Sequence, residues 1–257
     1  MNDTESEFIA KISNLSLVIQ GETILENINF NLKPGETFAI IGKNGAGKTM
    51  LLKSLIGIFT PTRGDVHMFN VDMVNTKESQ LVPIRQKTGY VFQKSGLFDS
   101  LTVEDNVLFA LERFTGKKRE ELSAKVTSLL ASTGLKGVEK KFPSELSGGM
   151  QKRAGIARAI AMDPDLLLMD DPTAGLDPIL SDAIGELILD IKKVKQMTTI
   201  IVTHDIKLAY KLADRIALMH EGKFISVLDT EKFKISDNPY IYQYRNKLLE
   251  GPISVIR

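Results

Sequence analysis

The chain has 257 residues, of which 43% are hydrophobic and 25% charged, and its formal net charge is +1. This composition is typical of a globular protein that is long enough to form one large α/β domain or two small ones, and the near-neutral charge gives no electrostatic preference for nucleic acid or acidic lipid. The chain has no cysteine and 3 histidines, which excludes disulfides, thiol catalysis and thiolate metal sites and argues against a zinc cluster.

The N-terminal stretch MNDTESEFIAK is polar and acidic, unlike a signal peptide. No apolar run approaches the ~20 residues that a membrane-spanning helix needs. We therefore expect the protein in the cytoplasm, unless a partner holds it at a membrane.

The first part of the chain predicts strands and one helix. Alternating or apolar runs predict strands at residues 9–19, 24–32, 37–42 and 88–93. Residues 47–59 have the apolar spacing of a helix, and we expect Pro61 and Gly64 to close it.

Residues 97–145 have a different pattern from the rest of the chain. They contain amphipathic helical patterns at 101–114 and 118–135 with no strand between them, which predicts a helical insertion in an α/β domain. Helices and strands then alternate at 149–162, 166–170, 179–194, 198–204 and 206–213, followed by a predicted hairpin at 216–227. This alternation predicts a parallel, doubly wound sheet.

The stretch GKNGAGKT, residues 42–49, matches the phosphate-binding pattern G-x-x-x-x-G-K-[ST] between a predicted strand and a predicted helix. Glycines let the backbone wrap closely around a phosphate with its N–H groups pointing inward, and the following helix adds roughly half a positive charge at its start. In such a loop Lys48 reaches the β- and γ-phosphates and the Thr49 hydroxyl ligates Mg²⁺. The expected nucleotide-binding residues are Gly42, Lys43, Asn44, Gly45, Ala46, Gly47, Lys48 and Thr49.

Two neighbouring aspartates end the predicted buried strand LLLMD. We expect Asp170 to hold Mg²⁺ through water, facing Thr49. The alternative is that Asp170 and Asp171 only cap the turn at Pro172.

A second candidate anion site is the stretch SGG at residues 147–149, which precedes a predicted helix. Serine is a favourable N-cap and two glycines allow a close approach, so this helix start can bind an anion. On its own the stretch would be an ordinary capped turn, but the phosphate loop and the helical insertion favour the binding site.

Six motifs follow one another along the chain: GKNGAGKT, Gln93 in YVFQ, LSGGM, LLLMDD, AGLD and His204 in VTHD. Together they resemble the ATP-binding-cassette ATPase family over residues 8–230. The resemblance implies a P-loop NTPase fold with a RecA-like parallel-sheet core, an N-terminal antiparallel β subdomain and an inserted helical subdomain. It implies an ATPase domain at 8–235, with the insertion at about 97–145, and a C-terminal tail helix at 236–257. ATP and Mg²⁺ are the implied cofactors.

The resemblance also implies a role for single residues. Gln93 is similar to a glutamine that touches Mg²⁺ and senses the γ-phosphate, and His204 to a histidine that contacts the γ-phosphate and orients the attacking water. Asp177 is similar to a residue that links the two sites of a homodimer, in which each chain supplies half of each site. The implied catalytic residues are Asp171, His204 and Gln93, and the implied metal ligands are Thr49, Gln93 and Asp170. The residues implied to bind the ATP of the partner chain are Ser147, Gly148 and Gly149.

The sequence departs from the family pattern at two places. The family usually has glutamate where this chain has Asp171, whose carboxylate is one methylene shorter, and we expect hydrolysis that is reduced at most, not abolished. The family often stacks adenine on an aromatic residue of the first strand, but the matching positions here are Val18 and Ile19. The aliphatic surface lacks the ~0.5–1.5 kcal/mol that aromatic stacking can add, which puts base selectivity in doubt.

Membrane transport, the usual work of the family, requires a separate permease here. Leu97, Phe98 and Leu101 are candidates for a groove that receives a permease helix, or they pack inside the helical insertion. A position on the cytoplasmic face of the inner membrane follows from such a partner, and no nucleic-acid partner is expected.

A narrower resemblance concerns the cargo. Three stretches are similar to Mla-type lipid-transport ATPases: FQKSGLFDSLTVEDNV, DDPTAGLDPI and the tail SDNPYIYQYRNKLLEGPI. These work with a permease and an MCE-type lipid-binding protein in maintaining outer-membrane lipid asymmetry. The alternatives are a cassette ATPase for another cargo, a non-transport cassette protein, and an ATP-gated dimerisation switch with little turnover.

Overall fold

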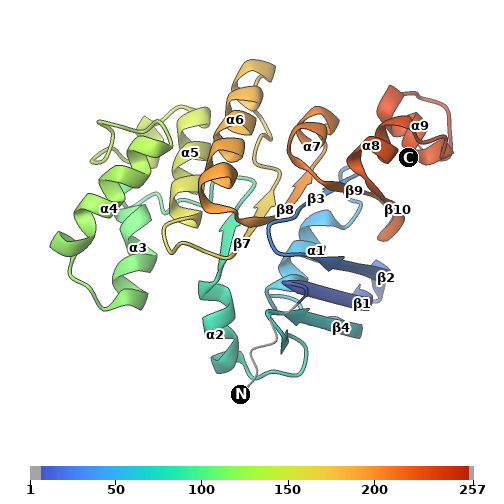
Figure 1. The fold of residues 1–257 in the computed structure, drawn as a ribbon, viewed down its shortest axis with the longest axis horizontal. Coiled ribbons are helices and arrows are strands. Elements are labelled where there is room, and N and C mark those ends of the chain that lie inside the picture. Colours follow the sequence, from blue (N-terminus) through green and yellow to red (C-terminus); the bar gives the residue numbers. More distant parts are fainter. Residues whose placement is uncertain (1–6, 255–257) are drawn as a thin grey trace. The chain divides into compact units, whose positions relative to one another are not determined.

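The computed structural model describes residues 7–254, with Lys195 described by its backbone alone. The chain divides into two compact units, the first formed by Met1–Arg85 and Thr198–Arg257 and the second by Gln86–Met197. Figure 1 shows the elements of both. Within the described residues, no helix combines the length and hydrophobicity that crossing a membrane requires.

The first unit begins with an antiparallel sheet whose strand order is β2-β1-β4-β5. Strands β1 (Ala10–Ile19) and β2 (Glu22–Leu32) form a hairpin, joined by Gln20 and Gly21 with positive φ angles of 51° and 85°. Both angles suit the twist of a two-residue hairpin turn. The remaining strands are β4 (Arg63–Met68) and the short β5 (Val71–Asp72).

The first unit also contains a set of parallel strands. Strand β3 (Thr37–Ile41) lies between β8 (Thr198–Thr203) and β9 (Arg215–His220) and is parallel to both. Strand β10 (Lys223–Asp229) returns antiparallel to β9, as the predicted hairpin requires. All residues of β3 and β8 are buried, which is typical of parallel strands with both faces covered.

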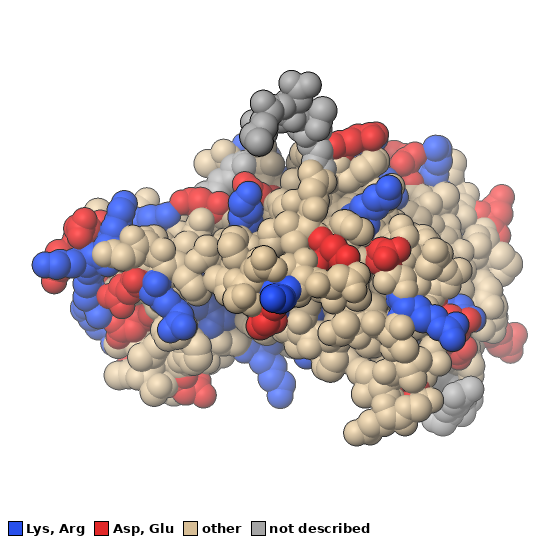
Figure 2. Space-filling model, turned by 90° about the horizontal axis from the view of Figure 1, so that it is seen from below, with Lys and Arg blue, Asp and Glu red and all other residues tan. Residues whose placement is uncertain are grey.

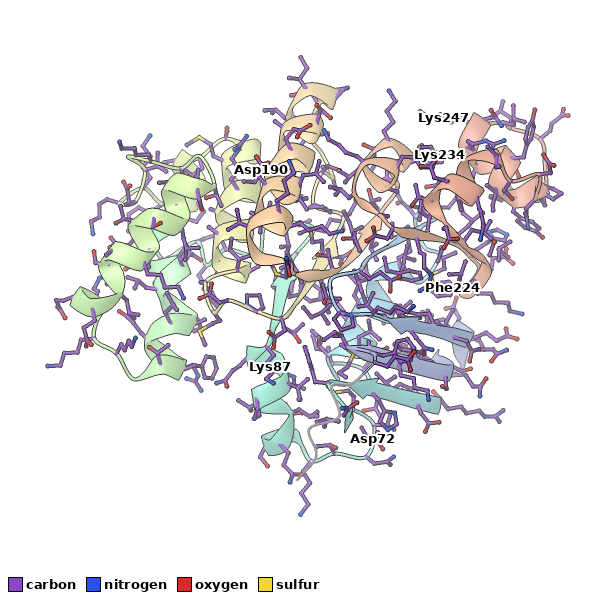
Figure 3. All side chains as sticks on the ribbon, in the orientation of Figure 1. Asp72, Lys87, Asp190, Phe224, Lys234 and Lys247 are labelled. Carbon is purple, nitrogen blue, oxygen red and sulfur yellow. The ribbon has the colours of Figure 1, made fainter. Side chains whose placement is uncertain are left out.

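Aromatic packing joins the two sets of strands in the first unit. The ring of Phe30 on β2 stacks on that of Phe38 on β3 at a centroid distance of 4.9 Å. The ring of Phe224 on β10, labelled in Figure 3, lies 5.8 Å from Phe30 and 6.2 Å from Phe38. This cluster fixes the antiparallel sheet against the strands that carry the phosphate loop.

The first unit contains helices that follow its parallel strands, one helix at the boundary with the second unit, and two helices near the C-terminus. Helix α1 (Lys48–Leu55) follows β3, and α7 (Ile206–Leu212) follows β8. Helix α2 (Glu78–Gln86) ends at the boundary between the units. After β10 come α8 (Thr230–Ile235) and α9 (Pro239–Asn246).

The second unit combines two parallel strands with helices. Strands β6 (Thr88–Val91) and β7 (Leu166–Asp170) pair in parallel. Helices α3 (Val103–Thr115), α4 (Arg119–Ser132) and α5 (Gly148–Ala159) pack against one another, with the 3-10 turn η1 (Pro143–Glu145) before α5. Helix α6 (Pro178–Lys195) follows β7 and contacts α5.

The structure corrects one detail of the predicted elements. Helix α1 ends at Leu55, and the chain turns at Gly57 with a φ of 70°, so Pro61 and Gly64 do not close the helix. Gly64 lies in β4 with a φ of 86°, and a Cβ there would come within 2.4 Å of the Asn14 backbone on β1. Glycine is required there because two strands approach closely.

The other predicted elements up to the hairpin at 216–227 are confirmed to within a few residues, and so is the α/β class with an antiparallel N-terminal sheet. The predicted tail helix at 236–257 is shorter than expected, because its helix covers only Pro239–Asn246, and residues 255–257 lie outside the described residues. The helical patterns at 101–114 and 118–135 correspond to α3 and α4. Five elements of the described residues have no counterpart in the sequence prediction: α2, β4, β5, η1 and α8. Charged residues of both signs are interspersed on the face that Figure 2 shows, in line with the near-neutral net charge.

Candidate functional site

The predicted phosphate loop connects β3 to α1 in the first unit. Gly42 has a φ of 154°, and a Cβ there would come within 2.2 Å of the Met219 carbonyl oxygen on β9. Any other side chain would therefore push the loop away from the strand that supports it. The loop keeps its path because a glycine follows β3 at this position.

Lys48 begins α1 and turns back over the loop. Its side chain is buried, and Nζ donates hydrogen bonds to the carbonyl oxygens of Gly42 and Lys43, both at 2.8 Å. No side chain caps the start of α1, and its first turn contains no acidic residue. A buried ammonium next to uncapped N–H groups at a helix start forms a site that attracts anions. These residues fit a phosphate group.

His204 follows β8 directly, and its side chain is exposed. The register pairs Ile41 with Thr203, so the carboxyl ends of β3 and β8 bring Gly42 and His204 to the same edge of the strands. The hydroxyl of Tyr244 on α9 lies 3.2 Å from the His204 carbonyl oxygen and 3.4 Å from that of Gly42. The sequence patterns do not predict Tyr244, because nothing in them brings α9 to the phosphate loop.

Asp170 ends β7 in the second unit and is 5% exposed. The Tyr90 hydroxyl donates to its Oδ2 at 3.4 Å. Burial, together with the nearby charge of Asp170, raises the pKa of Tyr90 well above its ordinary value of 10.0. Tyr90 therefore remains a hydrogen-bond donor to Asp170 at every physiological pH.

Asp171 is the next residue, 7% exposed and in a left-handed conformation with a φ of 48°. Aspartate tolerates this conformation better than most residues other than glycine and asparagine. The structure thus places the shorter acid at a position where the backbone favours it.

A buried lysine that the sequence patterns do not predict accompanies the acidic pair. Lys152 on α5 is 7% exposed, and its Nζ donates to the backbone carbonyl oxygen of Gln93. Burial lowers the pKa of Lys152, while the negative charges of Asp171 and Asp170 oppose that shift. The ammonium thus holds the backbone of Gln93 close to the acidic pair, while the Gln93 side chain is exposed.

The stretch SGG opens α5 as predicted. The Ser147 hydroxyl accepts from the Met150 N–H at 3.3 Å, and the first turn contains no acidic residue. Ser147 and Gly148 are exposed. This helix start can therefore be reached by an anion from outside the chain.

Asp177 has a structural role that is visible in a single chain. Its Oδ1 accepts from the N–H groups of Ile179 at 2.9 Å and Leu180 at 3.0 Å, which makes it the N-cap of α6. Its expected role across a dimer stays a prediction.

The predicted site residues form two groups, one in each unit. The first unit contains residues 42–49 and His204, and the second contains Gln93, the aspartates 170 and 171, and residues 147–149. The hydroxyl of Thr49 and the carboxylate of Asp170 are oxygen ligands of the kind that Mg²⁺ prefers. The described residues contain no group of three or more histidines or acids arranged to hold a metal ion.

The end of β1 has the aliphatic surface that the sequence predicts for the base. Val18 is 41% exposed, and Ile19 is half-buried. Whether adenine lies there stays a prediction.

Comparisons with known proteins agree with the motifs. The family model described as ABC transporter matches residues 25–174. The probable ribonucleotide transport ATP-binding protein of Mycobacterium tuberculosis is 36% identical over 245 residues, which cover 95% of this chain and 68% of that protein. The Arabidopsis thaliana chloroplastic protein named trigalactosyldiacylglycerol 3 is 36% identical over 249 residues, covering 90% of this chain and 71% of that protein.

A solved structure is similar as well. A dimeric ATP-binding cassette in a post-hydrolysis state, bound to ADP and Pi, matches with a TM-score of 0.79 and 31% sequence identity over 86% of this chain and 98% of that chain. Its fold is the one that the motifs imply.

Proposed function

The chain belongs to the ABC transporter family, and on this premise we propose that it is the ATP-hydrolysing subunit of a transporter that moves phospholipid. Membership implies an ATPase that uses ATP with Mg²⁺. The observation that carries this function is the glycine loop at the start of α1, where Lys48 is folded onto the loop's own carbonyl oxygens. The cargo is the finer part of the proposal and has separate support.

Binding of the triphosphate uses groups that are already in place. Lys48 exchanges the carbonyl oxygens of Gly42 and Lys43 for phosphate oxygens, and the N–H groups of the loop and of the first turn of α1 donate to the same phosphates. Thr49, Asp170 and Gln93 would hold Mg²⁺, which neutralises charge on the β- and γ-phosphates when bound. Tyr90 keeps the Asp170 carboxylate oriented through its hydroxyl.

Hydrolysis requires a base and a group that orients water. Asp171 takes the role of the general base, and its negative charge favours the charged form of the buried Lys152. His204, exposed at the end of β8, contacts the γ-phosphate and orients the water.

A second copy of the chain completes each site. The exposed start of α5 at Ser147 binds the γ-phosphate of the partner chain's ATP. The dimeric solved cassette supports this arrangement. Loss of the phosphate removes the ligand that the two chains share, so the dimer opens.

An exposed aromatic cluster in the second unit is the proposed permease surface. We define the aromatic patch as Phe92, Phe98 and Phe109, which are 39%, 44% and 47% exposed. The rings of Phe98 and Phe109 lie 4.9 Å apart, and the guanidinium of Arg158 lies 5.6 Å from the Phe92 ring and 6.0 Å from the Phe98 ring. Such a group of exposed rings is typical of a protein-binding surface.

The three residues that the sequence suggests for a permease groove differ in exposure. Phe98 is exposed, while Leu97 and Leu101 are half-buried. The buried Asn106 holds this segment rigid, because its Oδ1 accepts from the Phe98 N–H at 2.7 Å and its Nδ2 donates to the Thr102 carbonyl oxygen at 2.9 Å. A rigid loop costs less entropy when a permease helix binds.

Two observations support a lipid cargo. One relative is named for trigalactosyldiacylglycerol, which is a galactolipid. The tail that resembles the Mla type contains the helix α9, with Asn238 as its N-cap and Pro239 in its first turn. An MCE-type lipid-binding protein is then the third component, and the complex works at the cytoplasmic face of the inner membrane. The relative named for ribonucleotide transport marks the competing cargo.

The test is transport by the protein in complex with its permease, reconstituted in vesicles that contain a fluorescent phospholipid. We expect lipid transfer that needs ATP and stops in the Asp171→Asn variant. Phe98→Ala should release the permease, whereas Phe142→Ala, which truncates a ring that is 43% exposed, should not. ATP turnover that responds to ribonucleotide, without lipid transfer, would refute the proposed cargo.

Asp171 also favours a second candidate function, an ATP-gated dimerisation switch with slow turnover. A wild-type protein that binds ATP and dimerises, yet hydrolyses ATP too slowly to measure, would establish the switch and refute the proposed transport ATPase.

A further inference from the structure

The end of the chain folds back onto the phosphate loop. We call residues 238–254 the C-terminal strap. Ile241 on α9 is fully buried, and the Tyr240 ring lies 5.6 Å from the ring of His220 at the end of β9. The Arg245 guanidinium donates to the Lys234 carbonyl oxygen on α8; Figure 3 labels Lys234 and also Lys247, which follows α9. The strap is thus anchored on elements of the first unit.

A buried glutamine closes the strap on itself. Gln243 is 4% exposed. Its Nε2 donates to the Ile253 carbonyl oxygen at 2.9 Å, and its Oε1 accepts from the Ile253 N–H at 2.7 Å. This pair of bonds returns the chain toward the phosphate loop, where Lys43 Nζ donates to the Ser254 carbonyl oxygen. The strap therefore has a defined structure against the loop.

Tyr244 connects the strap to both strand ends at the site. Its hydroxyl is 3.2 Å from the carbonyl oxygen of His204 and 3.4 Å from that of Gly42. These residues follow β8 and β3, which pair up to Thr203 and Ile41. The hydroxyl hydrogen can be directed at either oxygen, and the shorter contact is to His204. One side chain thus fixes the backbone of the histidine relative to the first residue of the loop.

We propose that Tyr244 is a positioning residue for ATP hydrolysis, because its hydroxyl holds the backbone of His204 in place beside the phosphate loop. This inference rests on the proposed role of His204. The imidazole is carried by the backbone at the strand end, so a shift of that backbone moves it, and a displacement of about 1 Å at a catalytic group can cost about 100-fold in rate. Nucleotide binding depends on Lys48 and the loop N–H groups, and the Tyr244 hydroxyl is not one of these binding groups.

The test is steady-state hydrolysis by the full chain with Tyr244→Phe, which keeps the ring and removes the hydroxyl. We expect kcat to fall about 3- to 10-fold, the equivalent of one hydrogen bond, with the nucleotide dissociation constant changed by less than about twofold. The matched control is Tyr242→Phe on the same helix, whose side chain is 49% exposed; its kcat should equal that of the wild type. An unchanged kcat in Tyr244→Phe would overturn the inference.

A double-mutant cycle separates positioning from general support of the fold. In a His204→Ala background we expect Tyr244→Phe to have no further effect on kcat. An equal fall in both backgrounds would mean that the hydroxyl supports the structure without acting through His204, and it would refute the inference. If His204→Ala itself leaves turnover unchanged, the proposed role of His204 fails first, and the two failures are distinguishable.

Discussion

Replacing Asp171 by asparagine is the sharpest perturbation of the proposed chemistry, because it changes charge and little else. The side chain keeps its size at a position that is 7% exposed. Asparagine also tolerates the backbone φ of 48° as well as aspartate does. The fold should therefore survive with at most about 1 kcal/mol of lost stability. The negative charge and the ability to accept a proton are removed.

The expected loss of rate follows from that role. A positioned general base contributes about 10²- to 10⁴-fold, which corresponds to about 2.7 to 5.5 kcal/mol in the barrier. Lys152 adds to the effect, because its buried ammonium then faces one negative charge of the acidic pair instead of two. We expect phosphate release at saturating ATP and Mg²⁺ to fall at least 100-fold, while the nucleotide dissociation constant stays within about threefold.

Asp171→Glu is the matched control, because it restores the carboxylate on a longer stem. The added methylene enters a buried position and should cost about 1–3 kcal/mol of stability, but turnover should remain within about tenfold of the wild type. Turnover of Asp171→Asn within about threefold of the wild type, with normal nucleotide binding, would show that Asp171 is not the base. A wild type that binds ATP but gives no measurable phosphate would also contradict our expectation of reduced but preserved hydrolysis.

Three further predictions concern stability. Gly42→Ala should lower the free energy of unfolding by more than about 3 kcal/mol, because the new Cβ would lie 2.2 Å from the Met219 carbonyl oxygen behind the loop. Gly45→Ala, whose Cβ would have no atom within 4 Å, should cost only about 1 kcal/mol. Equal losses of the two variants in urea unfolding would contradict this. Asp177→Ala should lower the free energy of unfolding by about 1 kcal/mol, because α6 loses its N-cap. Asp177→Asn keeps the cap, so its thermal midpoint should match that of the wild type. A midpoint as low as that of the Asp177→Ala variant would exclude the capping role. Hydrogen bonds from the Thr102 hydroxyl and then from the Arg119 guanidinium lower the pKa of Asp105. Their contribution to stability is therefore present above the unfolded pKa of about 3.9 and is lost as the pH falls through the lower folded pKa. Asp105→Asn should cost about 0.5 kcal/mol at pH 7, and this cost should shrink as the pH falls below about 3.9; a cost independent of pH would refute the assignment.

The local patterns predict most of the fold, because period and punctuation are local properties. The buried strand at 37–41 and the glycine loop after it have signatures within about a dozen residues, and so has the amphipathic α3. The sequence misses α2, which contains Pro83, and β4, where Gly64 has the character of a turn residue. Gly64 is explained only by the approach of Asn14 from another strand, which no local pattern contains.

The same limit applies to the site. Residues 42–49 are predicted because the phosphate loop is contiguous. Lys152 and Tyr244 are missed because their contacts are distant in sequence: Lys152 meets the Gln93 carbonyl oxygen across 59 residues, and Tyr244 meets that of Gly42 across 202. Such partners carry no spacing signal, and the fold must be known before they can be found.

The central claim is that one ATP binds between two copies of this chain, and the mass in solution tests it directly. For the Asp171→Asn variant, which should bind ATP without consuming it, light scattering with Mg²⁺ and ATP should give twice the 28.5 kDa of one chain, and one chain's mass without nucleotide. Ser147→Asp should abolish this doubling, because it keeps the N-cap of α5 but places a negative charge at the proposed phosphate site, whereas Ser147→Asn keeps both the cap and the neutral charge and should still double. A protein that binds ATP with full affinity and remains at the mass of one chain would contradict the account.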